Sequence, residues 1–129
     1  MYLATKLRQR LASDESGFTL IELLVVLVII GILLAIAVPS YLGFKDRANN
    51  RAAQADVREA VPSAEAYYSD NGYYTGLSTT ALKAIDSGLS SAVSVISAGA
   101  SAYCLKAAVS TKNAYFGGPG GTVTSTACT

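Results

Sequence analysis

Several residue types that catalytic and metal sites depend on are missing or scarce in this sequence. Its 129 residues include no histidine and only two cysteines. A Ser-His-Asp triad and a Cys-His pair both need histidine, and the usual zinc sites need more histidine or cysteine ligands than the chain contains. We therefore expect a protein that is not an enzyme and that holds no metal and no cofactor.

Charge is also scarce, and it is balanced. Charged residues make up 15% of the chain, the net charge is +1, and basic residues occur singly rather than in runs. Nucleic-acid grooves are strongly basic, so DNA is conceivable as a partner but is not indicated by the charge. The glycine-rich stretch 117–121 contains no lysine and lacks a strand-to-helix setting, so it predicts a turn rather than a phosphate loop. No small-molecule substrate is expected.

The sequence does contain one long apolar run. Over the 21 residues from Phe18 to Val38, only Thr19, Glu22 and Gly31 interrupt the aliphatic and aromatic side chains. As a helix this run is about 32 Å long, close to the thickness of the hydrocarbon core of a bilayer. The remaining residues are rich in alanine, serine, threonine and glycine, which predicts a small and thin core.

Two ordinary interpretations of the run stay open on the residues alone. The basic residues before it and Ala35-Ile36-Ala37 within it fit a secretory signal cut after Ala37, although the run is long for such a signal and contains Glu22. A simple one-pass anchor is the other interpretation. Charge counting does not give its orientation, because three basic residues lie on each side. These are Lys6, Arg8 and Arg10 before the run, and Lys45, Arg47 and Arg51 after it.

The start of the apolar run resembles the processing signature of type IV prepilins. It reads Glu15-Ser16-Gly17-Phe18-Thr19-Leu20-Ile21-Glu22-Leu23-Leu24-Val25-Val26. The resemblance implies that a membrane peptidase cuts between Gly17 and Phe18 on the cytoplasmic side and methylates the new amino group of Phe18. The apolar helix then stays on the mature chain. The resemblance also assigns subunit assembly to Glu22 and a helix kink to Pro39.

The same resemblance implies the partners and the location of the protein. The precursor would be a single-pass protein of the cytoplasmic (inner) membrane, where it meets the prepilin peptidase and an inner-membrane assembly platform. Identical copies would then form a homo-oligomer, a helical fibre. This extracellular pilus on the cell surface would serve adhesion, twitching motility or DNA uptake.

The position of Glu22 agrees with an assembly role on physical grounds. A carboxylate is costly to bury in a membrane or a fibre core unless it reaches water, is protonated or finds a cation. Cleavage after Gly17 would create such a cation, the amino group of Phe18, on a neighbouring subunit. Because a paired acid tolerates burial and an unpaired acid resists it, we expect this pair to set the axial register.

A helical pattern continues beyond the apolar run and leads to a small domain. One apolar stripe recurs at helical spacing, and after residue 76 strand-like segments with alternating apolar residues follow. The expected fold class is α+β, with a long N-terminal helix packed on a small antiparallel sheet, the type IV pilin fold. The stripe consists of Ala53, Val57, Val61, Ala64 and Tyr68. The expected parts are a leader at 1–17, a transmembrane and assembly helix at 18–39, an amphipathic continuation at 40–72 and a β domain at 73–129.

Turn and helix-breaking residues predict the limits of these elements. Pro39 and Pro62 each remove a backbone donor, so we expect bends or short melted turns there. Asn71-Gly72 is expected to end the long helix. A threonine at 79 or 80 is expected to cap a short helix, and Lys112-Asn113 is expected to supply a hairpin turn.

Cys104 and Cys128 are the only cysteines, and both lie on the exported side of the proposed span. Exported cysteine pairs usually form a disulfide, and pilins commonly close their C-terminal region in this way. A disulfide restricts the unfolded chain, so closing the loop between these two cysteines stabilises the fold by about 3 kcal/mol. This is a large share of the stability of a protein with a thin core.

Subunits of this kind belong to more than one machine. A repeating pilin builds a pilus, a major pseudopilin builds the type II secretion pseudopilus, and a minor subunit caps or primes either. Major pseudopilins usually carry a C-terminal calcium loop with acidic ligands, whereas Asp86 is the last acidic residue here, which favours a pilus. The rival from another class is a small secreted domain cut after Ala37. A mature chain that begins at Phe18 indicates a prepilin, and one that begins at Val38 indicates the secreted domain.

Overall fold

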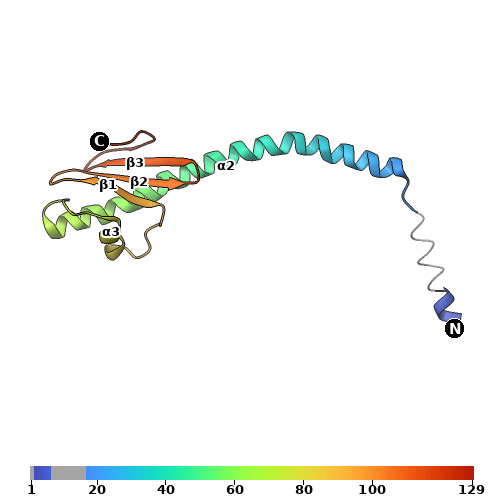
Figure 1. Cartoon of the computed structure of the whole chain (residues 1–129), viewed down its shortest axis with the longest axis horizontal. Coiled ribbons are helices and arrows are strands. Elements are labelled where there is room, and N and C mark those ends of the chain that lie inside the picture. Colours follow the sequence, from blue (N-terminus) through green and yellow to red (C-terminus); the bar gives the residue numbers. More distant parts are fainter. Residues whose placement is uncertain (1, 7–16) are drawn as a thin grey trace. The chain divides into compact units, whose positions relative to one another are not determined.

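A computed structural model describes residues 2–6 and 17–129 of the chain (Figure 1). The expected leader at 1–17 therefore lies largely outside the described residues, as do Arg8, Arg10 and Glu15-Ser16 of the signature. The chain divides into two units, Met1–Leu42 and Gly43–Thr129, and we call the second unit the head.

The longest element is the helix α2, Leu20–Asn71. It ends where the sequence predicts, because Gly72 adopts a left-handed conformation with a φ of 78° and its N–H donates to the Tyr68 carbonyl at 2.7 Å. The expected melted turns do not occur, since the helix continues through Pro39 and Pro62. A proline removes only one donor, and the flanking hydrogen bonds maintain the helix. The kink assigned to Pro39 stays a prediction about the assembled fibre.

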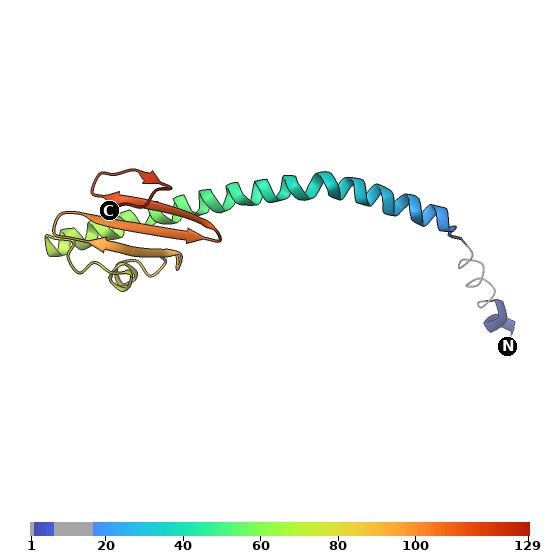
Figure 2. The same ribbon diagram turned by 45° about the horizontal axis from the view of Figure 1, so that its top comes forward.

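Four antiparallel strands form the sheet of the head (Figure 2). They are β1 (Val93–Ala98), β2 (Tyr103–Val109), β3 (Lys112–Gly118) and β4 (Val123–Thr124), and they lie in the order β1-β2-β3-β4. The register between β2 and β3 places Leu105 opposite Phe116 and Ala107 opposite Ala114. The predicted α+β arrangement of a long helix on a small antiparallel sheet is confirmed. One short helix, α3 (Thr79–Ile85), lies between α2 and the strands in the sequence.

The core of the head lies between the sheet and the part of α2 that runs beside it. Ala53, Val57 and Ala64 of the predicted stripe are fully buried, but Ala60 is also buried, and Tyr68 is 42% exposed. Most of the residues that α2 buries are alanines, so the core is thin, as the composition predicts. Leu105 is the largest aliphatic contribution from β2, and its burial stabilises the fold by about 2 kcal/mol. The other buried residues of the sheet include Val93, Tyr103, Ala107, Ala114 and Phe116.

Two local predictions are wrong by one or two residues. The N-cap of α3 is Ser78, whose hydroxyl accepts a hydrogen bond from the Ala81 N–H at 3.1 Å, rather than a threonine at 79 or 80. The hairpin between β2 and β3 turns at Ser110-Thr111, and Lys112 already begins β3. Serine and threonine both favour caps and turns, so composition alone could not select the position.

The glycine-rich stretch 117–121 is a turn only in its second half. β3 includes Gly117 and Gly118, and a Cβ atom at Gly118 would overlap the ring of Tyr103. Glycine at this position is therefore required by close packing against a buried tyrosine.

A disulfide joins Cys104 of β2 to Cys128 near the C-terminus, with the Cα atoms 5.8 Å apart, which confirms the predicted pairing. Cys104 is 1% exposed and alternates with Leu105, so it occupies the face of the sheet opposite the helix. Beyond β4 the side chains of residues 125–127 are exposed. The crosslink is thus the principal attachment of this tail.

Replacing both cysteines with serine should release the tail while leaving α2 and the sheet folded. Because the crosslink is worth about 3 kcal/mol, we expect a protease to cut the segment after β3 on the order of a hundredfold faster. Limited proteolysis with mass spectrometry measures this, and Thr126→Ser serves as a matched control that changes the same tail but keeps the disulfide. Labelling of both cysteines in the non-reduced native protein by a thiol reagent would contradict the crosslink itself.

Candidate assembly site

Glu22 lies in the first turn of α2 and forms a reciprocal cap with Thr19. The Thr19 N–H donates to Glu22 Oε2 at 2.8 Å, and Thr19 Oγ1 accepts from the Glu22 N–H at 3.4 Å. This is a capping box, in which Thr19 is the N-cap and Glu22 is the third helical residue. Sequence reasoning missed this cap, although the Thr-x-x-Glu spacing is a signal that could have predicted it.

The cap leaves the Glu22 carboxylate able to take a second partner. The side chain is exposed, and a carboxylate accepts several hydrogen bonds at once. Glu22 can therefore hold the start of its own helix and still accept a donor from another molecule. A cation would be the most favourable second partner, because charge-assisted hydrogen bonds are stronger than neutral ones.

The residues assigned to processing lie directly before this cap. Gly17, Phe18 and Thr19 belong to no helix or strand, and the Phe18 side chain is 85% exposed. The peptide bond after Gly17 can therefore be reached without unwinding α2. The structure brings Gly17, Phe18 and Glu22 into one short segment, whereas Pro39 lies farther along α2 and the disulfide belongs to the head.

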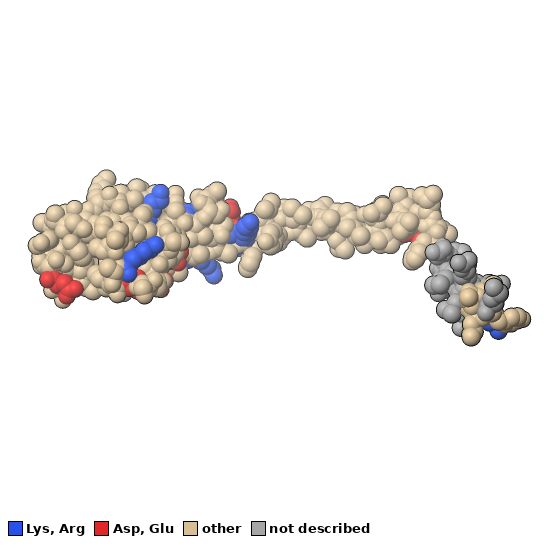
Figure 3. Space-filling model, turned by 60° about the horizontal axis from the view of Figure 1, so that its bottom comes forward, with Lys and Arg blue, Asp and Glu red and all other residues tan. Residues whose placement is uncertain are grey.

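The helix that follows presents an uncovered apolar surface. Every side chain from residue 17 to 48 is exposed, and the large apolar ones range from 46% for Ile30 to 87% for Leu20. Between Glu22 and Lys45 this stretch contains no charged residue, and Figure 3 shows a long run of it without blue or red side chains. The segment is long and apolar enough to cross a membrane. A soluble single chain rarely exposes so large an apolar patch, so lipid or other apolar helices must cover it.

In the head, a second carboxylate ties α2 to the sheet. The hydroxyls of Tyr74 and Tyr103 donate to the two carboxylate oxygens of Glu65 at 2.9 and 2.8 Å, and their rings lie 4.6 Å apart. Burial, together with the bond to Glu65, raises the pKa of Tyr74 to about 12 and also raises the pKa of Tyr103. A tyrosine of ordinary pKa already donates at neutral pH, and the raised pKa values keep both hydroxyls protonated and donating to Glu65 at more alkaline pH as well. Sequence reasoning missed this link because Tyr103 lies 38 residues from Glu65.

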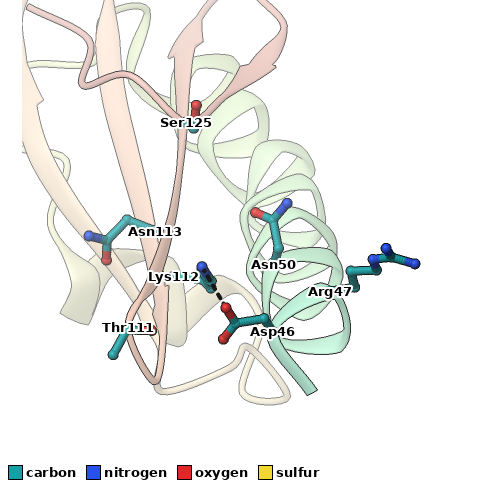
Figure 4. A pocket seen from close by; sticks show the side chains of 7 residues that line it. All are labelled: Asp46, Arg47, Asn50, Thr111, Lys112, Asn113 and Ser125. Carbon is teal, nitrogen blue, oxygen red and sulfur yellow. Dashed lines mark ion pairs between the residues drawn. The ribbon is translucent and has the colours of Figure 1, made fainter. Parts of the chain in front are cut away.

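An ion pair links α2 to the β2–β3 hairpin at the start of the head. Lys112 Nζ lies 3.3 Å from Asp46 Oδ2, in the one ion pair found among residues 2–6 and 17–129. Because the two side chains are 35% and 62% exposed, the pair contributes at most about 1 kcal/mol. It borders an open groove of about 450 Å³, and Figure 4 shows Arg47 turned away from Lys112. The other lining residues are Asn50, Thr111, Asn113 and Ser125.

Known proteins share both the N-terminal segment and most of the chain. Residues 12–38 match the family model of the prokaryotic N-terminal methylation motif. Over 107 residues the chain is 38% identical to the type IV wide pilus major component PilA4 of Thermus thermophilus, and the match covers 80% of each protein. The chain belongs to the type IV pilin family.

Other relatives of this pilin match over about half of it. It is 37% identical over 65 residues to the type II secretion system core protein G of Escherichia coli, covering 50% of the pilin and 45% of that protein. It is 37% identical over 59 residues to the type IV major pilin protein PilA of Myxococcus xanthus, covering 46% of the pilin and 27% of that protein. These relatives are structural subunits, so the pilin is a structural protein and not an enzyme. Membership in the family implies assembly into a polymeric fibre and processing by prepilin peptidase.

Proposed function

We propose that this pilin is the repeating subunit of a type IV pilus. The observation that carries the proposal is the uncovered apolar surface of α2, in which Glu22 is the only charged residue before Lys45. Once such a helix leaves the membrane, other copies of the same helix are the surface that can bury it on all sides. Similarity to a pilus component over 80% of both chains supports a pilus in particular.

In this proposal the chain is first a single-pass precursor in the inner membrane. Prepilin peptidase cuts the leader 1–17 from Phe18 on the cytoplasmic side and methylates the new amino group. The segment 18–39 then moves from lipid into the fibre core with the help of the assembly platform. The segment 40–72 connects this core to the β domain 73–129, which lies on the outside of the extracellular pilus.

In this proposal Glu22 pairs with the Phe18 amino group of the neighbouring subunit. An unpaired carboxylate in a fibre core would cost several kcal/mol, whereas a cation beside it offsets most of that cost. The capping box supports the role, because it holds the carboxylate at the end of the helix where the cut chain begins. The pair acts as a register mark, since a shifted neighbour would bury the acid without its partner.

A second candidate is a major pseudopilin of a type II secretion system. The observation that favours it is the 37% identity to the core protein G of Escherichia coli. Asp86 is the last acidic residue of the pilin, so the C-terminal acidic loop expected of a major pseudopilin has no counterpart in residues 87–129. This difference favours the pilus.

The mature N-terminus tests the proposal directly. Fibres sheared from the cell surface should contain this chain beginning with methylated Phe18, as read by N-terminal sequencing and mass spectrometry. A soluble product beginning at Val38 would instead establish a secreted domain. Deleting the gene for this chain should abolish surface fibres and leave protein secretion unchanged. Loss of secretion with normal surface fibres would instead establish the pseudopilin.

A further inference from the structure

Charge is unevenly divided along the part of α2 that belongs to the head. Residues 43–51 carry three basic residues and one acidic residue, and the ion pair brings Lys112 of β3 to the same place. We call this group the basic end. Its net charge is +3, and its helical basic side chains are exposed. The basic end consists of Lys45, Asp46, Arg47, Arg51 and Lys112.

The last part of α2 carries the opposite charge. Residues 59–71, the acidic end, contain Glu59, Glu65 and Asp70 and no basic residue, a net charge of −3. Figure 3 shows an acidic patch at the extremity of the head where α2 terminates. Glu59 and Asp70 are exposed and about three helical turns apart, so they lie on the same side of the helix.

Within a single chain this arrangement is unfavourable. The C-terminus of a helix carries a partial negative charge and favours basic side chains, but the last turn of α2 has none and contains Asp70. Basic residues directly after a span, on its exported side, likewise go against the usual charge bias of membrane proteins. The charges of both ends are thus unfavourably placed, and a nearby charge of opposite sign would offset this.

The two ends cannot supply that charge to each other in one molecule. Arg47 and Asp70 are separated by about 35 Å of helix, several times the screening distance of about 8 Å at physiological salt. None of the basic residues at 45, 47 and 51 forms an ion pair within the described residues, and the same holds for Glu59 and Asp70. Water and dissolved ions solvate these exposed charges in a single molecule, and an opposite protein charge can reach either end from another molecule.

We propose that the acidic end of one subunit docks against the basic end of the next subunit along the fibre. The inference rests on the proposed pilus, because a fibre of identical copies needs two different surfaces that complement each other at every contact. The receiving surface has two parts. One is the groove beside the Lys112–Asp46 pair, and the other is a second hollow that Arg47 and Arg51 line together with Phe44 and Ala48. Figure 4 shows Arg47 pointing away from Lys112, toward the second part. Each contact relieves the unfavourable charge of both ends at once.

Charge reversal tests this docking. Glu59→Lys with Asp70→Lys reverses the acidic end and spares Glu65, which holds the two tyrosines. Arg47→Glu with Arg51→Glu reverses the basic end. Each pair of changes should lower the yield of sheared fibres by about tenfold or more, because like charges then meet at every contact. Both variants made in one cell should restore the yield, since a subunit with two acidic ends can alternate with one that has two basic ends.

The control and the contrary outcomes separate this inference from the proposed function. Arg58→Glu reverses an exposed charge between the ends, and it should leave the yield unchanged. Normal yields from both reversal variants would overturn the docking, whereas absence of fibres from the unaltered chain would overturn the pilus. If reversal of the basic end removes the precursor from the membrane and co-expression does not help, these residues bind lipid headgroups and the inference is wrong. If a reversal variant is degraded, the milder changes Asp70→Asn and Arg51→Gln replace it. Each should lower the yield of sheared fibres by about threefold. An unchanged yield would overturn the docking.

Discussion

Replacing Gly17 with leucine should leave the pilin as an uncut precursor in the membrane and abolish its fibres. The leader would stay attached to Phe18, so no amino group would form there to meet Glu22 of a neighbour. The basic residues of the leader would also have to enter or skirt the apolar core of the fibre, at a cost of several kcal/mol for each buried charge. Immunoblotting of membranes and of sheared fibres measures both effects.

The precursor must first be shown to be intact. Insertion depends on the apolar run after residue 18 rather than on Gly17, so the amount of Gly17→Leu protein in the membrane should match that of the unaltered chain. Gly17→Ala is the matched control, because it adds one methyl group, and it should be cut more slowly but still yield fibres. Normal fibres from the Gly17→Leu chain would show that cleavage at this bond is not needed for assembly.

Removing the charge of Glu22 should allow insertion and cleavage but reduce fibres by about a hundredfold or more. An uncompensated amino group of Phe18 in the fibre core costs several kcal/mol at every subunit, and the register mark is lost. Glu22→Ala and Glu22→Gln should both show this loss. The mature chain should still begin at Phe18 and accumulate in the membrane, as measured by N-terminal sequencing of membrane protein.

The glutamine variant distinguishes the two things that Glu22 can do. Glutamine keeps the capping box with Thr19, because its amide oxygen still accepts from the Thr19 N–H, but it carries no charge. If Glu22→Gln assembles as well as the unaltered chain while Glu22→Ala does not, Glu22 acts by capping the helix, and the proposed pairing with Phe18 is wrong. Thr19→Ser is a control that preserves both the cap and the charge.

Much of the candidate site could be predicted because its signals are local in the chain. Gly17, Phe18 and Glu22 lie within six residues, and an apolar run of membrane length follows them directly. Local spacing also predicts the end of α2 at Asn71-Gly72, since glycine there tolerates the left-handed conformation. Local signals were not enough to place the N-cap at Ser78 or the hairpin turn at Ser110. Several neighbouring residues suit a cap or a turn almost equally well.

The class of the protein can be recognised from its amino-acid sequence. Three features carry this recognition: the absence of histidine, the apolar run and the signature around Gly17. They depend on residue types and on the length of a run, so no tertiary contact is needed to recognise them. The alternating apolar residues of the strand-like segments likewise predicted a one-sided sheet, and β2 buries Tyr103, Leu105 and Ala107 on the helix side, although Cys104 on the opposite face is buried too.

The contacts between residues far apart in the chain could not be predicted in this way, and they became known from the fold. Glu65 takes two tyrosine hydroxyls, Lys112 reaches Asp46, and Tyr103 forbids a side chain at Gly118, although none of these pairs is close in sequence. The same holds for the basic end, where a hairpin residue joins the helix and so adds to its charge. Such contacts follow from the packing of a whole sheet against a helix, and packing depends on many side chains together rather than on any local pattern.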